Sequence, residues 1–243
     1  MTVHYHGTPI TPRSVLQSLS GKHFCVSFAK PQDAAECHLI GQGVMLDNGA
    51  FSLWKLNPRA ATYVWDAFYA WARPWLDYHS TWAVIPDVIG GTETENDLLI
   101  NKSIREFGGI NQIAPVWHMH ESFERLEGLV CRFNRVCIGS SAQYSVIGSD
   151  AWNNRMNEGF NRICKGGSGK PRAWIHMLRG MSLSGSSYPF ASVDSTDVAR
   201  NHNRPQNNAR QMANDWDASQ CPARWTQKPL QQLLESPSLC DGN

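Results

Sequence analysis

The stretch WAVIPDVIGGTETENDLLINKSIREFGGINQIAPVWHM, residues 82–119, contains two short apolar runs on either side of a helix-like segment. The runs at 82–88 and 112–119 are rich in β-branched and aromatic residues and are bounded by Pro, Gly and Asp, which is typical of buried strands. The segment 94–107 between them predicts a helix. A strand, a helix and a second strand in this order predict a parallel βαβ unit.

The same alternation continues through the rest of the chain. Short apolar runs predict further strands at 23–29, 43–51, 135–141, 172–178 and 190–196. Helices are predicted at 122–133, at 151–164 and from the cap and first-turn proline of Asn57-Pro58 to about residue 76. This pattern predicts an α/β fold, a compact (β/α)8 barrel of the TIM type, with a doubly wound open sheet as the alternative.

A single barrel domain is expected over residues 1–243, because the chain shows neither an internal repeat nor a linker. Its core is predicted at about 20–205, followed by a polar tail over 206–243. No eighth strand can be assigned in that tail, although 226–235 predicts a closing helix. The extreme N-terminus, with its His4-x-His6 pattern, is expected to be a poorly ordered end.

The composition limits the class of protein. A hydrophobic content of 42% argues against global disorder, and a net charge of +1 argues against a strongly basic nucleic-acid binder. The seven cysteines include no Cys-x-x-Cys pair, which favours a reducing compartment. Neither a signal-peptide pattern nor a long apolar stretch is found, so a cytoplasmic protein without a membrane partner is expected.

Acidic residues occur at the C-terminal ends of three predicted strands: Asp47, Asp87 and Asp194. In barrels and in open α/β sheets these ends form the active face, so the three carboxylates are expected to lie close together. A single Asp at a strand end is commonly a turn former or a helix cap. Three like charges in one cleft cost free energy and raise one another's pKa, which indicates a function.

The pair His118 and His120 raises the question of a metal site. Residues at i and i+2 of a strand point the same way, which suits two metal ligands. A zinc site needs three or four placed ligands, and no third ligand is evident from the spacing. We therefore predict no metal, and expect His118 either to form hydrogen bonds or to lie exposed at the rim.

Four motifs carry a resemblance to a known superfamily. DNGAFS (47–52), IPDVIG (85–90), IGSSAQY (138–144) and SVDSTDVAR (192–200) resemble, in the same order, motifs of the tRNA-guanine transglycosylases. In particular, the chain resembles over about 20–205 the short DpdA-type branch of phages and bacterial islands, which inserts 7-deazaguanine bases into DNA. The Cys-x-Cys-x-x-Cys zinc pattern of the tRNA enzymes is missing, which favours DNA and a barrel without their zinc subdomain.

The resemblance implies a transglycosylase that exchanges guanine in DNA for a 7-deazaguanine such as preQ0. Asp194 would be the nucleophile that forms a covalent glycosyl-enzyme, and Asp47 the general acid/base. Residues implied to bind the base are Asp87, Phe51, Asn48, Gly49, His118, Gly139, Ser140 and Met177, and those implied to bind the nucleic-acid backbone are Arg200 and Arg204.

Within this set, individual contacts are implied for the base. Asp87 would accept hydrogen bonds from N1–H and the 2-amino group of a guanine-like ring. Phe51 and Met177 would sandwich that ring. Backbone N–H groups near Gly139 and Ser140 would bind its 6-oxo group.

The implied partners are double-stranded DNA with a flipped guanine and the 7-deazaguanine base, with no other cofactor and no zinc. A homodimer or helper proteins are left open. The alternatives are a related enzyme acting on tRNA, a barrel nucleoside hydrolase or glycosidase that uses the same carboxylates, and a non-catalytic partner subunit.

Overall fold

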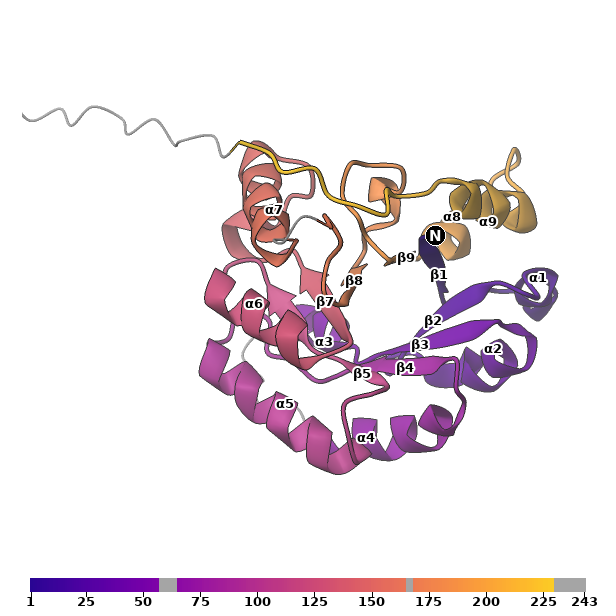
Figure 1. Cartoon of the computed structure of the whole chain (residues 1–243). Coiled ribbons are helices and arrows are strands. Elements are labelled where there is room, and N and C mark those ends of the chain that lie inside the picture. The colour runs from indigo at the N-terminus through magenta and orange to yellow at the C-terminus, as the bar shows by residue number, and fades with distance from the viewer. Residues whose placement is uncertain (57–64, 165–167, 230–243) are drawn as a thin grey trace, which may run out of the picture.

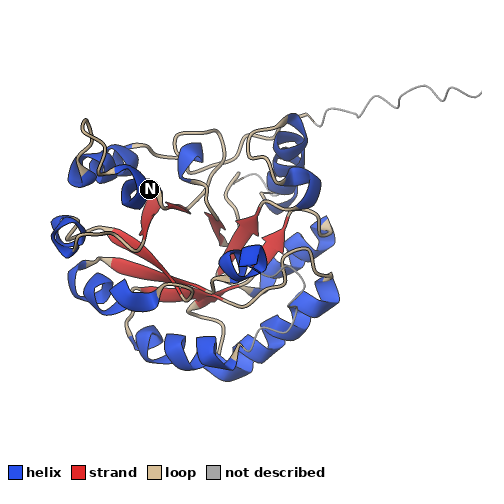
Figure 2. Cartoon of the chain, turned by 180° about the vertical axis from the view of Figure 1, so that it is seen from behind, coloured by secondary structure: helices blue, strands red, loops and turns tan. Residues whose placement is uncertain are grey.

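The strands form a barrel with helices on its outside (Figures 1 and 2). The computed structural model describes residues 1–56, 65–164 and 168–229, and over these residues nine strands make one sheet in the order β5-β4-β3-β2-β1-β9-β8-β7-β6. Every strand pair is parallel. The strands are β1 (Val3–Gly7), β2 (His23–Ser27), β3 (Gly43–Asp47), β4 (Thr81–Val84), β5 (Ile113–Ala114), β6 (Val116–His118), β7 (Arg135–Gly139), β8 (Trp174–Met177) and β9 (Ser192–Ser195). The predicted α/β barrel is confirmed.

The ring closes at Pro115, which separates β5 from β6. The carbonyl of Ala114 accepts a hydrogen bond from Ile85 N at 3.1 Å, on the β4 side, and the carbonyl of Pro115 accepts from Cys137 N at 2.9 Å, on the β7 side. Proline has no N–H to donate, so it interrupts one strand and leaves two short halves. Counted as halves of one strand, they give the eight strands of a TIM-type barrel.

Helices surround the ring, most of them on its outer face, whereas the one that follows β3 lies across an end of the ring (Figures 1 and 2). They are α1 (Arg13–Ser18), α2 (Ala34–Ile40), α3 (Ala50–Leu56), α4 (Asp66–Ala72), α5 (Glu93–Phe107), α6 (Phe123–Arg132), α7 (Asp150–Ile163), α8 (Asp197–Asn201) and α9 (Ala209–Ala218), with 3₁₀ helices η1 (Pro31–Asp33), η2 (Arg73–Asp77), η3 (Ala142–Tyr144) and η4 (Met181–Leu183). The helices predicted at 94–107, 122–133 and 151–164 are confirmed. At the start of α5, Thr92 and Glu95 form a capping box, which satisfies N–H groups that the first turn cannot.

The strand that could not be assigned from the sequence is β1, at the N-terminus. It lies between β2 and β9 and pairs with both. The expectation of a poorly ordered end was wrong, because His4 and His6 are 1% and 0% exposed. Their rings lie near Asp217 of α9, at 3.6 and 3.8 Å from its Oδ1 atom. This strand is therefore held by polar contacts as well as by its backbone pairing.

The ordered fold also extends beyond residue 205. Helix α9 buries Ala213 completely, and its Asp217 forms an ion pair with Lys22. The predicted helix from Asn57 begins outside the described residues, which resume at Trp65 just before α4. Of the closing helix predicted at 226–235, residues 226–229 are not helical and the others lie outside the described residues.

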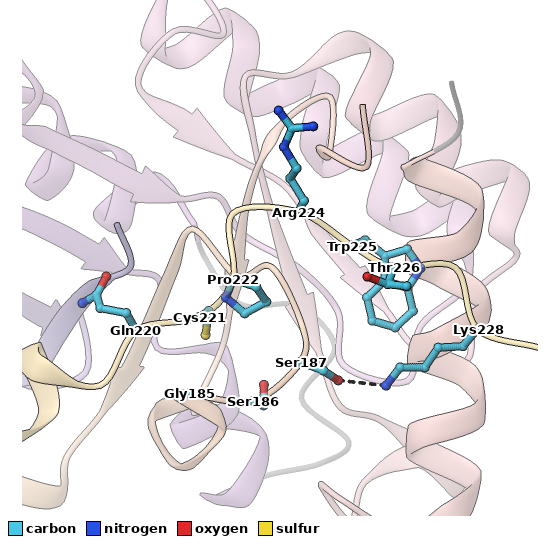
Figure 3. A pocket seen from close by; sticks show the side chains of 10 residues that line it. All are labelled: Gly185, Ser186, Ser187, Gln220, Cys221, Pro222, Arg224, Trp225, Thr226 and Lys228. Carbon is cyan, nitrogen blue, oxygen red and sulfur yellow. Dashed lines mark hydrogen bonds between the residues drawn. The ribbon is translucent and has the colours of Figure 1, made fainter. Parts of the chain in front are cut away.

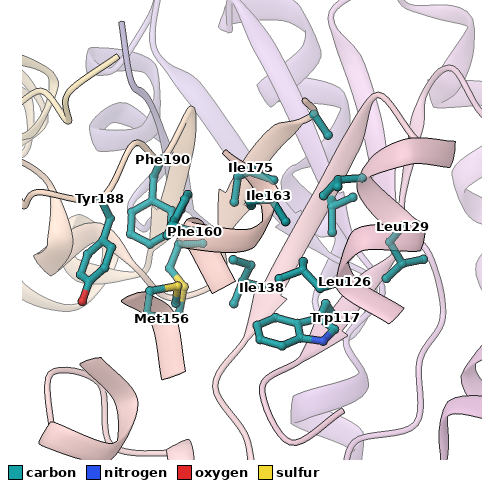
Figure 4. Close-up of a cluster of buried hydrophobic side chains, with 14 of the residues drawn as sticks. Trp117, Leu126, Leu129, Ile138, Met156, Phe160, Ile163, Ile175, Tyr188 and Phe190 are labelled. Atoms are coloured by element: carbon teal, nitrogen blue, oxygen red, sulfur yellow. The ribbon is translucent and has the colours of Figure 1, made fainter. Parts of the chain in front are cut away.

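Apolar side chains fill both the space between the ring and the helices and the inside of the ring. Figure 4 shows part of the outer core, where Trp117 and Ile175 pack with side chains of α6 and α7. A separate cluster contains Tyr5, Met45 and Trp82, and Trp82 Nε1 donates to Tyr5 Oη at 2.9 Å. Alternate residues of a strand share a face, so this cluster and Asp47, two positions beyond Met45, lie on the inner face.

Candidate active site

Three carboxylates lie at the end of the barrel to which the strands point. Asp47 is the last residue of β3, Asp87 follows β4 and Asp194 lies in β9. Burial raises the pKa of Asp47 to about 6, and the charges of Asp194 and Asp87 add to this increase, whereas hydrogen bonds from Ser27 and Gly49 oppose it. The three acids are thus within electrostatic reach of one another, although they are far apart in sequence.

The turn after Asp47 explains why a strand gives way to a helix here. Gly49 has a φ of +77°, a conformation that favours glycine, and its N–H donates to Asp47 Oδ2 at 3.1 Å. Ala50 N donates to Asn48 Oδ1 at 2.7 Å and begins α3. The strand predicted at 43–51 therefore ends at Asp47, because the Asx turn starts a helix.

Asp87 is held by two side chains. Asn48 Nδ2 donates to its Oδ1 atom at 2.7 Å, and His118 Nε2 lies 2.8 Å from its Oδ2 atom. Asn48 Nδ2 also donates to the carbonyl of Ile85 at 2.6 Å, so the amide joins the ends of β3 and β4. Each carboxylate oxygen has two acceptor positions, and Asp87 therefore keeps one on each oxygen for a ligand.

His118 is positively charged at neutral pH. Burial alone would lower its pKa, but hydrogen bonds and charges from Asp87 and Glu121 outweigh burial and raise the pKa to about 9. Burial would raise the pKa of Glu121, which is itself buried. Its hydrogen bonds with His118 and the charges of His118 and Arg125 outweigh burial, so the pKa of Glu121 is lowered. Asn96 donates to Glu121 Oε1 at 3.0 Å and fixes its orientation. Two buried carboxylates, Asp87 and Glu121, thus hold one imidazolium in place.

The sequence does not identify Glu121 as a residue of this site. Its carboxylate accepts from His118 N at 2.9 Å and lies 3.1 Å from Arg125 Nε, so it supports the site from behind. The only sequence signal was its spacing, three residues after His118 in a loop, and such a spacing alone does not distinguish a buried acid from a surface acid.

The charge on His118 predicts a pH dependence of stability. The pKa of about 9 lies above the ordinary value of 6.5, so the stabilisation is complete below pH 6.5 and is lost as the pH rises through 9. The shift corresponds to about 3 kcal/mol of unfolding free energy. Urea unfolding between pH 6.5 and 10 should show this loss in the wild type, and His118→Gln should lack it. Equal pH dependence in both proteins would contradict the charge assignment.

Asp194 is held through one of its oxygens. Its Oδ1 atom accepts from Arg179 N at 2.7 Å and lies 3.3 Å from His176 Nε2. Arg179 has a φ of +57°, which turns its N–H toward the carboxylate. In the part of the chain that the structure describes, no hydrogen bond is formed to Oδ2. The side chain is 13% exposed, so this second oxygen is the one available to a ligand.

Gly139 and Ser140 lie beside His118 at the end of β7. Gly139 is in register with His118, and a Cβ atom on it would approach Val116 Cγ1 to 3.2 Å and His118 Cδ2 to 3.6 Å. The glycine therefore leaves room next to the imidazole. The hydroxyl of Ser140 accepts from Trp152 Nε1 at 2.9 Å, which ties this loop to α7.

Phe51 lies on α3, which is seen behind the ring in Figure 1. Arg179 Cζ and Lys55 Nζ lie 4.5 and 4.4 Å from the centre of its ring, and Trp54 stacks beside it at 6.0 Å. Phe51 is therefore already in contact with cations and another aromatic ring, and a base could stack on it only if these side chains moved.

The structure does not bring Met177 to this site. His176 points inward to Asp194, so the next residue of the strand points outward, and Met177 is 0% exposed within the outer core. The prediction that Met177 stacks on a base is therefore wrong, because its side chain faces away from the site. Arg200, on α8, and Arg204, in the turn after it, are both exposed and close in sequence to β9.

Among the described residues, no group of three or more His, Cys, Asp and Glu side chains has the geometry of a metal site. His118 and His120 do not face a common point. The ring of His120 contacts Ser141 Oγ at 2.8 Å and the carbonyl of Gly91 at 3.3 Å, whereas His118 contacts Asp87. In the same described part, no helix is long and apolar enough to cross a membrane.

A pocket of about 550 Å³ lies between the C-terminal segment and a loop ahead of β9 (Figure 3). It is formed by the loop 185–187 and by segment 220–228, next to a hydrogen bond of 2.8 Å from Lys228 Nζ to Ser187 Oγ. None of the three carboxylates lines it.

No protein-family model matches the chain, and no curated protein matches its sequence. Two solved structures of tryptophan synthase from M. tuberculosis are similar in overall shape at 12% identity. The aminoacrylate- and BRD0059-bound form covers 93% of both chains with a TM-score of 0.47. The open form with BRD0059 covers 90% of this chain and 92% of that chain with a TM-score of 0.49. These similarities carry no information on substrate or reaction.

Proposed function

We propose that this chain is a transglycosylase that replaces guanine in DNA with a 7-deazaguanine base such as preQ0. The observation that supports this most is the set of three carboxylates in different surroundings at one end of the barrel. Asp194 is held by one oxygen, Asp47 has a pKa of about 6, and Asp87 is clamped by two donors. Carboxylates in contrasting environments can divide nucleophile, acid/base and binding roles.

In the first step, Asp194 Oδ2 attacks C1′ of the deoxyribose while the bond from C1′ to N9 of guanine breaks. The departing base takes a proton from the Asp47 carboxyl group. A covalent glycosyl-aspartate and free guanine result. Because the pKa of Asp47 is about 6, the protonated form is available near neutral pH.

In the second step, the incoming 7-deazaguanine gives its N9 proton to the Asp47 carboxylate. N9 then attacks C1′, and the bond from C1′ to Asp194 breaks. Both inversions take place at the same carbon, so the original configuration is restored. Asp47 is protonated again at the end, ready for the next cycle.

Base selection is assigned to Asp87. Its two remaining acceptor positions suit the N1–H and 2-amino donors of a guanine-like ring, which adenine does not present together. Asn48 and His118 fix the orientation of the carboxylate before the base arrives. A preorganised acceptor loses less free energy on binding than one that must be ordered.

Exposed cations near the ends of the strands support a nucleic-acid partner. Lys55 and Arg179 meet at Phe51, and Arg200 and Arg204 follow β9. The formal net charge is only +1, so binding of phosphates depends on this local arrangement. A target base must leave the duplex to reach acids inside the barrel end.

The proposal predicts a modified base in DNA. Nucleosides from cells that produce the protein are expected to contain a 7-deazaguanine deoxynucleoside by mass spectrometry, and cells that produce Asp194→Asn are expected to lack it. Transfer RNA from the same cells is the matched sample. A modified base found only in tRNA would favour the RNA alternative, and release of free guanine without incorporation would favour a hydrolase. Either result would contradict the proposal.

A further inference from the structure

A line of hydrogen bonds ends on Asp194. Trp174 Nε1 donates to Ser192 Oγ at 2.7 Å, Ser192 Oγ lies 2.8 Å from His176 Nδ1, and His176 Nε2 lies 3.3 Å from Asp194 Oδ1. Ser192 and His176 are both 0% exposed. Water therefore cannot satisfy these groups, and the direction of each hydrogen bond follows from the donors and acceptors present.

The indole of Trp174 can only donate, so Ser192 Oγ accepts from it. The hydroxyl proton of Ser192 then needs an acceptor, which His176 Nδ1 provides. A proton on Nδ1 would instead leave the buried hydroxyl proton unpaired, at a cost of about 1–3 kcal/mol. It would also set the lone pair of His176 Nε2 against a carboxylate oxygen. The proton is therefore on Nε2, which donates to Asp194.

Two aromatic rings pack against His176 on the inner face of the barrel. Tyr5 and Trp82 pack edge-on against it, with ring centres 6.0 and 5.2 Å away. The ring is fully buried and cannot reach a substrate. His176 thus acts through Asp194 and not on the reacting atoms.

We propose that His176 is a positioning residue whose Nε2–H tautomer, set by Trp174 and Ser192, fixes Asp194 so that Oδ2 is the attacking oxygen. This inference rests on the proposed function. Arg179 N is the second donor to Oδ1. When Oδ2 bonds to C1′, Oδ1 becomes the carbonyl oxygen of the ester and keeps both donors. When that bond breaks, the electron pair returns to the carboxylate, and the same donors stabilise the charge.

The first arm of the test needs no substrate. Nitrogen NMR of histidine-labelled protein, with the His176 signal assigned through its loss in His176→Gln, is expected to show the proton on Nε2 and an Nδ1 atom that accepts the hydrogen bond from Ser192. Trp174→Phe keeps an aromatic ring but removes the indole donor to Ser192, and it should shift the Nδ1 signal that reports the Ser192–His176 hydrogen bond. A ring protonated at Nδ1 in the wild type would overturn the proposal.

The second arm measures exchange kinetics. His176→Leu is expected to lower kcat by about 100-fold, the typical effect of removing one donor to a developing charge, with KM changed less than about twofold. His176→Gln retains an amide donor and should recover part of kcat. An unchanged kcat in His176→Leu, or equal loss in both variants while both remain folded by circular dichroism, would overturn the positioning role. If the wild type itself shows no exchange, the proposed function fails, and the NMR arm still decides the hydrogen-bond chain.

Discussion

Asp194→Asn is expected to abolish base exchange, with a rate at least about 10⁴-fold below that of the wild type. An amide oxygen can still accept from Arg179 N, so the loop keeps its anchor, but an amide is a very weak nucleophile toward C1′. The measurement is incorporation of an isotope-labelled 7-deazaguanine into a guanine-containing oligonucleotide, followed over time.

The matched control is Asp77→Asn, which removes an exposed carboxylate in η2, ahead of β4 and thus at the opposite end of the barrel from the three acids. This variant should exchange within about twofold of the wild type, as expected for a surface substitution. Wild-type rates in Asp194→Asn would place the nucleophile elsewhere. Loss of activity in both variants would point to a general effect of charge removal.

Asp47→Asn is expected to lower exchange by about 10²–10⁴-fold and at the same time to stabilise the fold. The pKa of Asp47 is raised from 3.8 to about 6, so its charge opposes folding above pH 6 and has no effect below 3.8. Removing the charge should raise the unfolding free energy by about 2–3 kcal/mol at pH 7, a gain that vanishes at pH 3.5. Urea unfolding at both values measures it.

This pair of results separates two roles for Asp47. A gain in stability together with a loss of exchange indicates that the Asp47 carboxylate takes part in catalysis although its charge destabilises the fold. If the exchange rate is unchanged, the role of Asp47 is limited to its hydrogen bond with Gly49. A loss of stability at pH 7 would show that this turn contact outweighs the burial and repulsion that raise the pKa.

Much of the barrel could be predicted because strands buried on both faces read as apolar runs between turn residues. β1 could not, since VHYHG places two histidines on the face that meets α9. Those histidines face Asp217, which is itself paired with Lys22, so polar partners from distant parts of the chain replace apolar packing. The sequence around β1 does not reveal these partners, because they lie far away in the chain.

The candidate site could likewise be predicted only in part from the sequence. The ends of parallel strands are fixed by topology, so Asp47, Asp87 and Asp194 could be expected to meet. Glu121 and His176 support the site through contacts with side chains that are distant in sequence. The spacing of residues along the chain does not encode these contacts. Met177 shows the reverse error, because strand period 2 allows only one of two neighbouring residues to face inward.

The covalent intermediate is the most direct test of base exchange at this barrel end. Wild-type protein would be mixed with a guanine-containing oligonucleotide, quenched in acid and examined by intact-mass spectrometry, with peptide mapping of 192–200. The account predicts a species heavier by the oligonucleotide minus one guanine, linked at Asp194 and discharged by added 7-deazaguanine. An adduct on another residue, or exchange that proceeds at full rate with no adduct at Asp194, would contradict it.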